Sequence, residues 1–258
     1  MSGSTIRIGV LGGIGPEATG EFYNKLIKGL QNRGIIKRNS DFPQIIINSI
    51  PAPELVFDKI SNSDLRQYIE GVKLLDRLGV DFIVMVCNTI HLYHERLQKE
   101  ITAPILDLRK EVKRVLVNEK GKVLVLGTPF TVKNKLYEFD DLEYTGLEEK
   151  ELDRVSKAIL DFNRGRKPRL MDVCRKYQKK GARIILACTE LAIMLENEKI
   201  PNINTVDVLV DATVIVNPQK NPDMYCGFTY SAQVSIISRI FTWSAITNSY
   251  HLNIRAVK

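Results

Sequence analysis

Two apolar runs of the sequence, about a hundred residues apart, each end at a cysteine and then change to a helical pattern. The first is FIVMVCNTIHLYHERL at residues 82–97, which stops at Cys87, and the second is ARIILACTELAIML at residues 182–195, which stops at Cys188. Residues 6–12 and 121–127 repeat in the same way, because each run ends at a glycine, Gly12 or Gly127, before a helical pattern. The sequence therefore predicts two copies of one strand–helix unit.

Strands that alternate with helices predict an α/β fold with parallel sheets covered on both faces. Ligands of such folds lie at the carboxyl ends of the strands, and both cysteines lie there. If the two copies pack about a pseudo-twofold axis, Cys87 and Cys188 face each other across one cleft, the expected active site. We expect a first α/β domain over residues 1–104, completed by about 206–217, a second over 105–205, and an unassigned extension over 218–258.

The composition excludes several classes of protein. With 44% hydrophobic and 26% charged residues, it is typical of a soluble globular chain, and no apolar stretch approaches the roughly 18–20 residues of a membrane span. The N-terminus lacks the layout of a secretory signal, so we expect a cytoplasmic protein without a membrane partner. The net charge of +7 comes from scattered basic residues, and their densest stretch, residues 164–169, contains no stacking aromatic. We therefore expect no nucleic-acid partner.

Cysteines at a helix start can perform acid–base chemistry, because the helix N-terminus favours the thiolate and lowers the thiol pKa toward neutrality. Two such groups on opposite sides of a flat carbanion allow one to remove a proton while the other returns a proton to the opposite face. Cys87 and Cys188 are thus predicted to invert a stereocentre.

Several motifs carry a family resemblance: LGGIGPEAT at residues 11–19, CNTIH at 87–91, LGT at 126–128 and GARIILACTE at 181–190. From about Ile6 to Asp211 the chain resembles the aspartate/glutamate racemase superfamily, and specifically its aspartate-racemase branch. The resemblance implies two similar α/β domains, no pyridoxal phosphate, no metal, a homodimer, and the cysteine pair as catalytic residues. The implied substrate is a free acidic amino acid, aspartate and possibly glutamate.

The resemblance also implies a set of substrate-binding residues. Hydroxyl, amide and backbone N–H groups at helix starts would hold the α-carboxylate and amino group; the residues are Asn88, Thr89, Thr128 and Thr189. Gly13 and Ile14 would let the backbone approach the ligand closely, and Glu190 is either a polar group of the site or a first-turn acid favoured by the helix dipole.

The chain departs from the family pattern where the substrate side chain would be recognised. An arginine expected after the proline-rich turn is replaced by Leu55, and a lysine expected near Asn163 is absent, so Arg164 or Arg166 is the candidate for a cationic contact. Glutamate racemases usually carry a histidine where this chain has Glu190.

Alternative readings remain for the site residues. Cys87 and Cys188 could be buried structural thiols, although their duplicated polar setting favours a function. Cys174, in the middle of a predicted helix, is expected to pack in the core, and Cys226 in the extension has no predicted role.

The glycine loop matches neither nucleotide-binding pattern. His91, His94 and Glu95 lack the order and the third ligand of a zinc site, and His91 either tunes the thiol or has a structural role. Two other functions stay open: another carbon-acid enzyme such as a decarboxylase or cis–trans isomerase, and a small-ligand binding protein.

Overall fold

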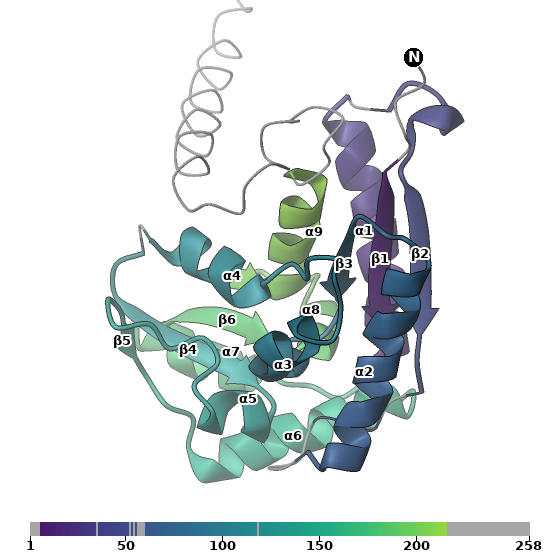
Figure 1. Cartoon of the computed structure of the whole chain (residues 1–258). Helices are drawn as coiled ribbons and strands as arrows, with labels where there is room; N and C mark the ends of the chain where they lie inside the picture. The colour runs from purple at the N-terminus through teal and green to yellow at the C-terminus, as the bar shows by residue number, and fades with distance from the viewer. Residues whose placement is uncertain are drawn as a thin grey trace, which may run out of the picture. The chain divides into compact units, whose positions relative to one another are not determined.

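A computed structural model describes residues 6–34, 36–51, 53, 55, 60–117 and 119–215. Residues 1–215 form one compact unit by their contacts, and Figure 1 shows two sheets within it, each with helices beside it. The extension at 218–258, with Cys226, lies outside the described residues. The predicted α/β fold with parallel sheets is confirmed, because every strand pair in both sheets is parallel.

The first sheet, sheet A, has the strand order β2-β1-β3. Its strands are β1 (Arg7–Gly12), β2 (Gln44–Ser49) and β3 (Phe82–Met85), and the isolated bridge of Ile83 to Ile105 extends its β3 edge. Helices α1 (Pro16–Asn32) and α2 (Asn62–Arg77) lie behind and in front of the sheet in Figure 1. The central strand β1 is buried from Ile8 to Gly12, as expected for a parallel strand covered on both faces.

The second sheet, sheet B, has the order β5-β4-β6-β7. It comprises β4 (Lys122–Gly127), the two-residue β5 (Glu143–Tyr144), β6 (Arg183–Ala187) and β7 (Asn202–Asn204). Four helices belong to this part of the chain: α5 (Pro129–Lys133), α6 (Glu149–Asn163), α7 (Met171–Lys179) and α8 (Thr189–Met194). The helix predicted after Gly127 is short, because α5 ends at Lys133 and turns follow, with Lys135 at a φ of 54°.

Helices α4 (Leu108–Leu116) and α9 (Thr205–Ile215) complete the unit. Helix α9 packs against α1 and α4, and on its exposed side Lys25 of α1 pairs with Asp207 at 2.7 Å. The chain thus returns from sheet B to the helices of sheet A. The division into two domains at residues 104 and 205 stays a prediction.

The segment after β3 differs from the predicted single helix. It begins as a 3-10 helix, η2 (Thr89–Tyr93), and continues as the short α3 (His94–Gln98). Another 3-10 turn, η1 (Asn39–Asp41), precedes β2. Among the described residues, no helix combines the length and apolar character needed to cross a bilayer.

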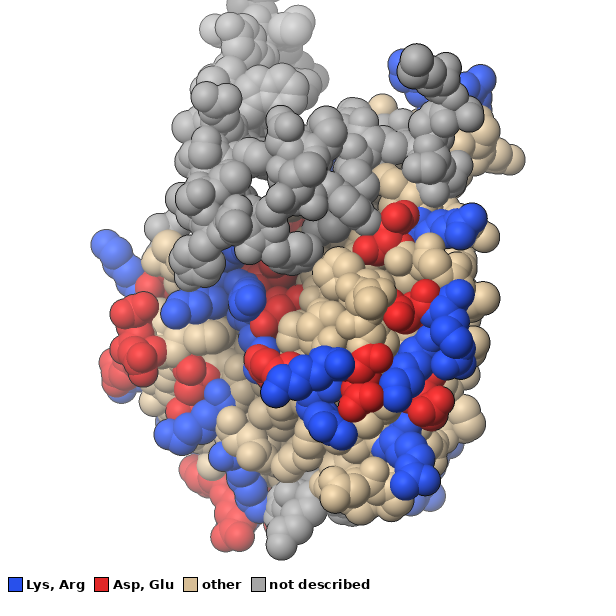
Figure 2. All heavy atoms as spheres, in the orientation of Figure 1, with Lys and Arg blue, Asp and Glu red and all other residues tan. Residues whose placement is uncertain are grey.

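Charged side chains of both signs are intermingled on the face of the described residues shown in Figure 2. Ion pairs link charged side chains of the described residues, such as Lys73 with Glu100 at 2.9 Å and Arg109 with Glu95 at 2.5 Å. This face of the described part therefore presents no continuous basic patch.

Candidate active site

The carboxyl ends of strands from both sheets meet around one cavity of about 230 Å³. Strand β3 leads to Cys87, β6 leads to Cys188, and the glycine loop after β1 closes another side. The residues that line the cavity are Gly13, Ile14, Gly15, Pro16, Pro53, Leu55, Cys87, Asn88, Thr89, Thr128, Ile159, Asn163, Cys188, Thr189 and Glu190. All nine residues predicted for the site are among them. Their catalytic and binding roles stay predictions.

The two thiols are enclosed, with Cys87 7% exposed and Cys188 6% exposed. Burial raises the pKa of Cys87 to about 12, although backbone N–H groups of Ile90 and Thr89 act in the opposite direction. Burial also raises the pKa of Cys188 well above its usual value. The prediction that a helix start lowers both pKa values is therefore wrong for the free protein, because desolvation outweighs the helix N-terminus.

Glu190 lies against Cys188 in the first turn of α8. The Cys188 thiol donates a hydrogen bond to Glu190 Oε2 at 2.9 Å, and the Thr189 hydroxyl donates to the same oxygen at 3.1 Å. After burial, the negative charge of Glu190 is the largest cause of the raised pKa of Cys188. Glu190 is therefore both a first-turn residue and a polar group of the cavity, and it keeps the neighbouring thiol protonated.

The glycine loop between β1 and α1 lies very close to neighbouring atoms of the site, and this is possible because its glycines have no side chains. Gly13 has a φ of 83°, and a Cβ there would collide with the backbone of Ile50. Gly15 has a φ of 94°, and its Cβ would lie 2.6 Å from Glu190 Oε1. These glycines are needed because a left-handed backbone and a close neighbour coincide at both positions.

Three buried threonine hydroxyls lie where the segment after β3 of sheet A meets the segment after β4 of sheet B. Thr89, from η2, lies 3.2 Å from Thr128 and 2.9 Å from Thr131, measured between Oγ1 atoms. Thr128 caps α5 by accepting from the backbone N–H of Thr131 at 3.1 Å. Sequence reasoning missed Thr131, although its spacing of three from Thr128 would place both on one face of a helix turn.

Asn88 contacts a second residue that sequence reasoning missed. The buried Tyr137 hydroxyl donates to Asn88 Oδ1 at 2.5 Å. The Asn88 amide nitrogen is shielded from solvent and has no hydrogen-bond partner among the described residues. Asn88 is a cavity-lining residue, and its amide nitrogen is a buried donor without an acceptor among the described residues.

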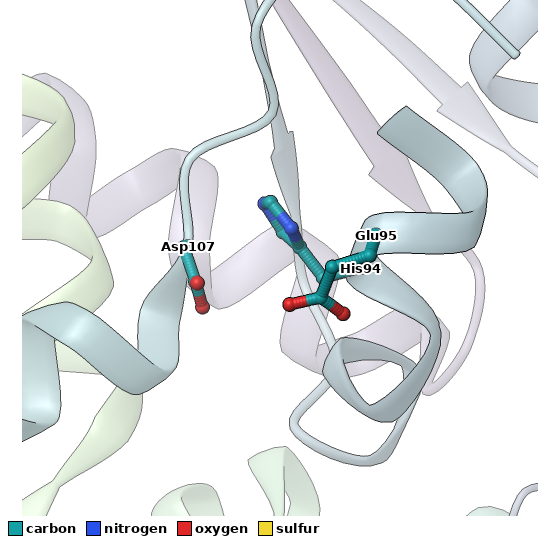
Figure 3. A group of neighbouring side chains, drawn as sticks. All are labelled: His94, Glu95 and Asp107. Carbon is teal, nitrogen blue, oxygen red and sulfur yellow. The ribbon is translucent and has the colours of Figure 1, made fainter. Parts of the chain in front are cut away.

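The histidines after Cys87 belong to a separate cluster beside α3 and α4. Figure 3 shows His94, Glu95 and Asp107, whose potential ligand atoms lie within 4.8 Å of one another. Arg109 donates to Glu95 Oε1 at 2.5 Å and to Asp107 Oδ2 at 2.9 Å, and His94 Nε2 lies 3.0 Å from the carbonyl oxygen of Ile105. The guanidinium thus supplies the positive charge that balances these carboxylates.

His91 stacks on His94, with 6.1 Å between ring centroids. It is fully buried, and neither ring nitrogen has a hydrogen-bond partner among the described residues. Burial lowers its pKa to about 3, against a smaller opposing effect of the Asp107 charge. At neutral pH its ring is therefore uncharged, which favours the structural role over the tuning of Cys87.

Leu55 and Asn163, which stand where cationic contacts are expected, both line the cavity. Leu55, Ile159 and the exposed Asn163 lie in its wall. Neither Arg164 nor Arg166 is among the lining residues, and Arg166 instead pairs with Asp161 at 2.6 Å. The prediction that one of these arginines reaches the substrate finds no support in the described geometry. Cys174 is fully buried in the core beside β6, as predicted.

Strands of two parallel sheets end at one small cavity. This arrangement is typical of an α/β enzyme whose small-molecule site lies between its sheets. Comparison with known proteins specifies the class further. The family described as Asp/Glu/Hydantoin racemase matches residues 11–213. The broad specificity amino-acid racemase RacX of Bacillus subtilis (strain 168) is 29% identical over 219 residues, which cover 80% of this chain and 96% of that protein.

Solved structures show the same fold. The aspartate racemase of Picrophilus torridus has a TM-score of 0.66 and 24% identity, over 81% of this chain and 93% of its own. An aspartate racemase homologue from Pyrococcus horikoshii OT3 has a TM-score of 0.62 and 24% identity, over 81% and 97%. The chain belongs to the Asp/Glu/Hydantoin racemase family. It is an amino-acid racemase of the type that works without pyridoxal phosphate.

Proposed function

We propose that the protein interconverts the enantiomers of an α-amino acid by a two-cysteine acid–base mechanism. The thiolate of Cys87 or Cys188 removes the proton from Cα, and the electron pair left on Cα is delocalised into the carboxylate. The thiol of the other cysteine then donates its proton to the opposite face of Cα. The observation that carries this proposal is the position of two thiols, from two different sheets, in the wall of one cavity.

The raised thiol pKa values require that the base form only when substrate is bound. An amino acid brings an ammonium group, and a positive charge within about 4–6 Å favours a thiolate. For Cys188, the Glu190 carboxylate that accepts its hydrogen bond at 2.9 Å is the nearest group that can take up the thiol proton. Thr89, Thr128 and the Asn88 amide would hold the α-carboxylate with neutral donors.

We propose an acidic amino acid as substrate, aspartate first and possibly glutamate. The family supports this choice, as do hydroxyl and amide donors that can bind a carboxylate without a cation. The wall formed by Leu55, Ile159 and Asn163 offers no arginine clamp, so discrimination between aspartate and glutamate is expected to be weak. The homodimer and the cytoplasmic location expected from the sequence also stay proposals.

The mechanism is tested by replacing each thiol separately. Cys87→Ala and Cys188→Ala should each lower racemisation by several orders of magnitude in both directions, because every turnover needs one base and one acid. Cys174→Ala is the matched control, since this buried cysteine lies in the core of the second half and not in the cavity. A single variant of Cys87 or Cys188 that stays folded and keeps more than roughly a tenth of wild-type activity refutes the two-base mechanism.

The substrate is tested by measuring kcat/KM for both enantiomers of aspartate, glutamate, asparagine, alanine and serine. A preference for a neutral side chain contradicts the acidic substrate and leaves the two-thiol mechanism standing. In D2O, the product enantiomer should carry deuterium at Cα before the remaining substrate does, because the proton it receives comes from a different thiol.

A further inference from the structure

The Asn88 amide is the one donor of the cavity wall whose orientation can be worked out from its neighbours. Tyr137 lies in the turn after α5, in the sheet B part of the unit, and its hydroxyl oxygen is 2.5 Å from Asn88 Oδ1. Both side chains are buried, at 0% exposure for Tyr137 and 1% for Asn88. The contact therefore spans the two halves of the site and is shielded from competing water.

The direction of this hydrogen bond follows from the available partners. A tyrosine hydroxyl carries one hydrogen, and Asn88 Oδ1 is the acceptor that the structure gives it among the described residues. If the amide were flipped, the hydroxyl hydrogen would face an NH2 group and would lose its acceptor. Burial raises the pKa of Tyr137 well above its usual value, so the hydroxyl keeps its hydrogen at any working pH.

Fixing Oδ1 on Tyr137 directs the amide NH2 group away from it. That nitrogen is enclosed and has no acceptor among the described residues, whereas buried polar groups normally have one. Asn88 lines the cavity, so a ligand carboxylate is the acceptor that the site lacks. Thr89 and Thr128, whose hydroxyl oxygens lie 3.2 Å apart, line the same cavity.

We propose that Tyr137 is a positioning residue of this racemase, which holds the Asn88 amide with its NH2 group free for the α-carboxylate of the substrate. The proposal rests on the proposed function. Tyr137 does not line the cavity and acts only through Asn88. Its role is the same for both enantiomers, because the carboxylate is common to them.

The first test is Tyr137→Phe, which removes one oxygen and keeps the ring. The amide then loses the contact that fixes its orientation, and KM for both enantiomers should rise about three- to tenfold, the range of one neutral hydrogen bond. The kcat should fall as well, because the carboxylate takes up the electron pair of Cα in the transition state and the amide contact becomes stronger there. An unchanged KM overturns the proposal.

A double-mutant cycle separates positioning from a general structural effect. In an Asn88→Ala background, Tyr137→Phe should have no further effect on KM, because the amide it positions is gone. Additive effects of the two substitutions overturn the proposal. The matched control is Tyr177→Phe, which removes a buried hydroxyl that donates to Glu151 at 2.6 Å, away from the cavity. It should leave KM unchanged, and a rise equal to that of Tyr137→Phe also overturns the proposal.

Asn88→Asp gives a test that does not depend on the folding of the Tyr137 variant. The aspartate keeps an oxygen for Tyr137 and exchanges the amide donor for a negatively charged acceptor, so KM should rise more than about tenfold. An unchanged KM contradicts the carboxylate contact. A wild-type protein that racemises no amino acid overturns the proposed function together with this proposal, whereas an active wild type with an unresponsive Tyr137 variant overturns the Tyr137 proposal alone.

Discussion

The buried ring of His91 predicts a specific loss of stability in acid. Burial lowers its pKa from 6.5 to about 3, so the folded protein keeps the ring neutral over a range in which the unfolded chain binds a proton. A base with a depressed folded pKa contributes stability that is present above the unfolded pKa and is lost as the pH falls toward the folded pKa. The window is therefore pH 6.5 down to about 3.

The size of the effect follows from proton linkage. One proton bound only by the unfolded chain changes the free energy of unfolding by about 1.4 kcal/mol per pH unit. Between pH 6.5 and 4.5 this amounts to about 2 kcal/mol, because only half of the unfolded chains carry the proton at pH 6.5, and it is a substantial part of the roughly 5–15 kcal/mol that stabilises a typical protein. Neither ring nitrogen has a hydrogen-bond partner of good geometry among the described residues, and the charge of Asp107 and the backbone of Met85 oppose the lowering of the pKa only in part.

The assay compares wild type with His91→Leu by urea denaturation, followed by far-UV circular dichroism at intervals from pH 7.5 to 4.5. Carboxylates such as Asp107, whose pKa is lowered by the hydrogen bond and charge of Arg109 against the effect of burial, contribute to both proteins and largely cancel in the difference. Leucine does not titrate, and the substitution removes no hydrogen bond of good geometry. The free energy of unfolding of His91→Leu should therefore rise relative to that of wild type as the pH falls. A difference that stays constant within about 0.5 kcal/mol between pH 7 and 4.5 refutes the reasoning.

Two further predictions concern the thiols. Burial raises the pKa of Cys87 to about 12 and that of Cys188 well above its usual value. Alkylation of the free protein by iodoacetamide should therefore speed up about tenfold per pH unit from pH 7 to 10. A plateau of the rate below pH 9 would contradict the raised pKa values. The second prediction concerns Glu190→Gln in a Cys87→Ala, Cys174→Ala background, which leaves Cys188 as the one cysteine among the described residues. This substitution should accelerate alkylation, because it removes a negative charge that raises the Cys188 pKa. An unchanged or slower rate would mean that Glu190 does not hold the proton on Cys188.

The positions of Cys87 and Cys188 could be predicted from topology, whereas Asn88, Thr89, Thr128 and Thr189 were named because of the family resemblance. Parallel strands end at the same edge of a sheet, so Cys87 and Cys188 had to follow β3 and β6 at their carboxyl ends. The glycines of the first loop were recognised for the same reason, because they follow the first strand. These signals are local in the sequence and need no knowledge of side-chain packing.

Thr131 and Tyr137 could not be found in this way. Both lie beyond the strand end, and they reach Thr89 and Asn88 only because of how the two sheets pack against each other. The helix predicted after Gly127 did not reveal the turn after Lys133 that contains Tyr137. The prediction of lowered thiol pKa values was wrong for a related reason. A helix N-terminus can be recognised in the sequence, whereas the burial of a thiol is a property of the packed site.

The burial of two neutral thiols also bears on how the proposed racemisation would be controlled. A thiolate that exists before substrate binds would be exposed to oxidants and alkylating agents, and its reactivity follows thiolate character and access. Here burial opposes ionisation of both thiols, and Glu190 opposes it further at Cys188. The charge needed to reverse this balance is positive and must enter the cavity itself, and the ammonium group of an amino acid provides it. The cavity walls that keep the thiols protonated in the free protein would therefore allow a thiolate to form, and a proton to be removed, only when a carbon acid is bound between the two thiols.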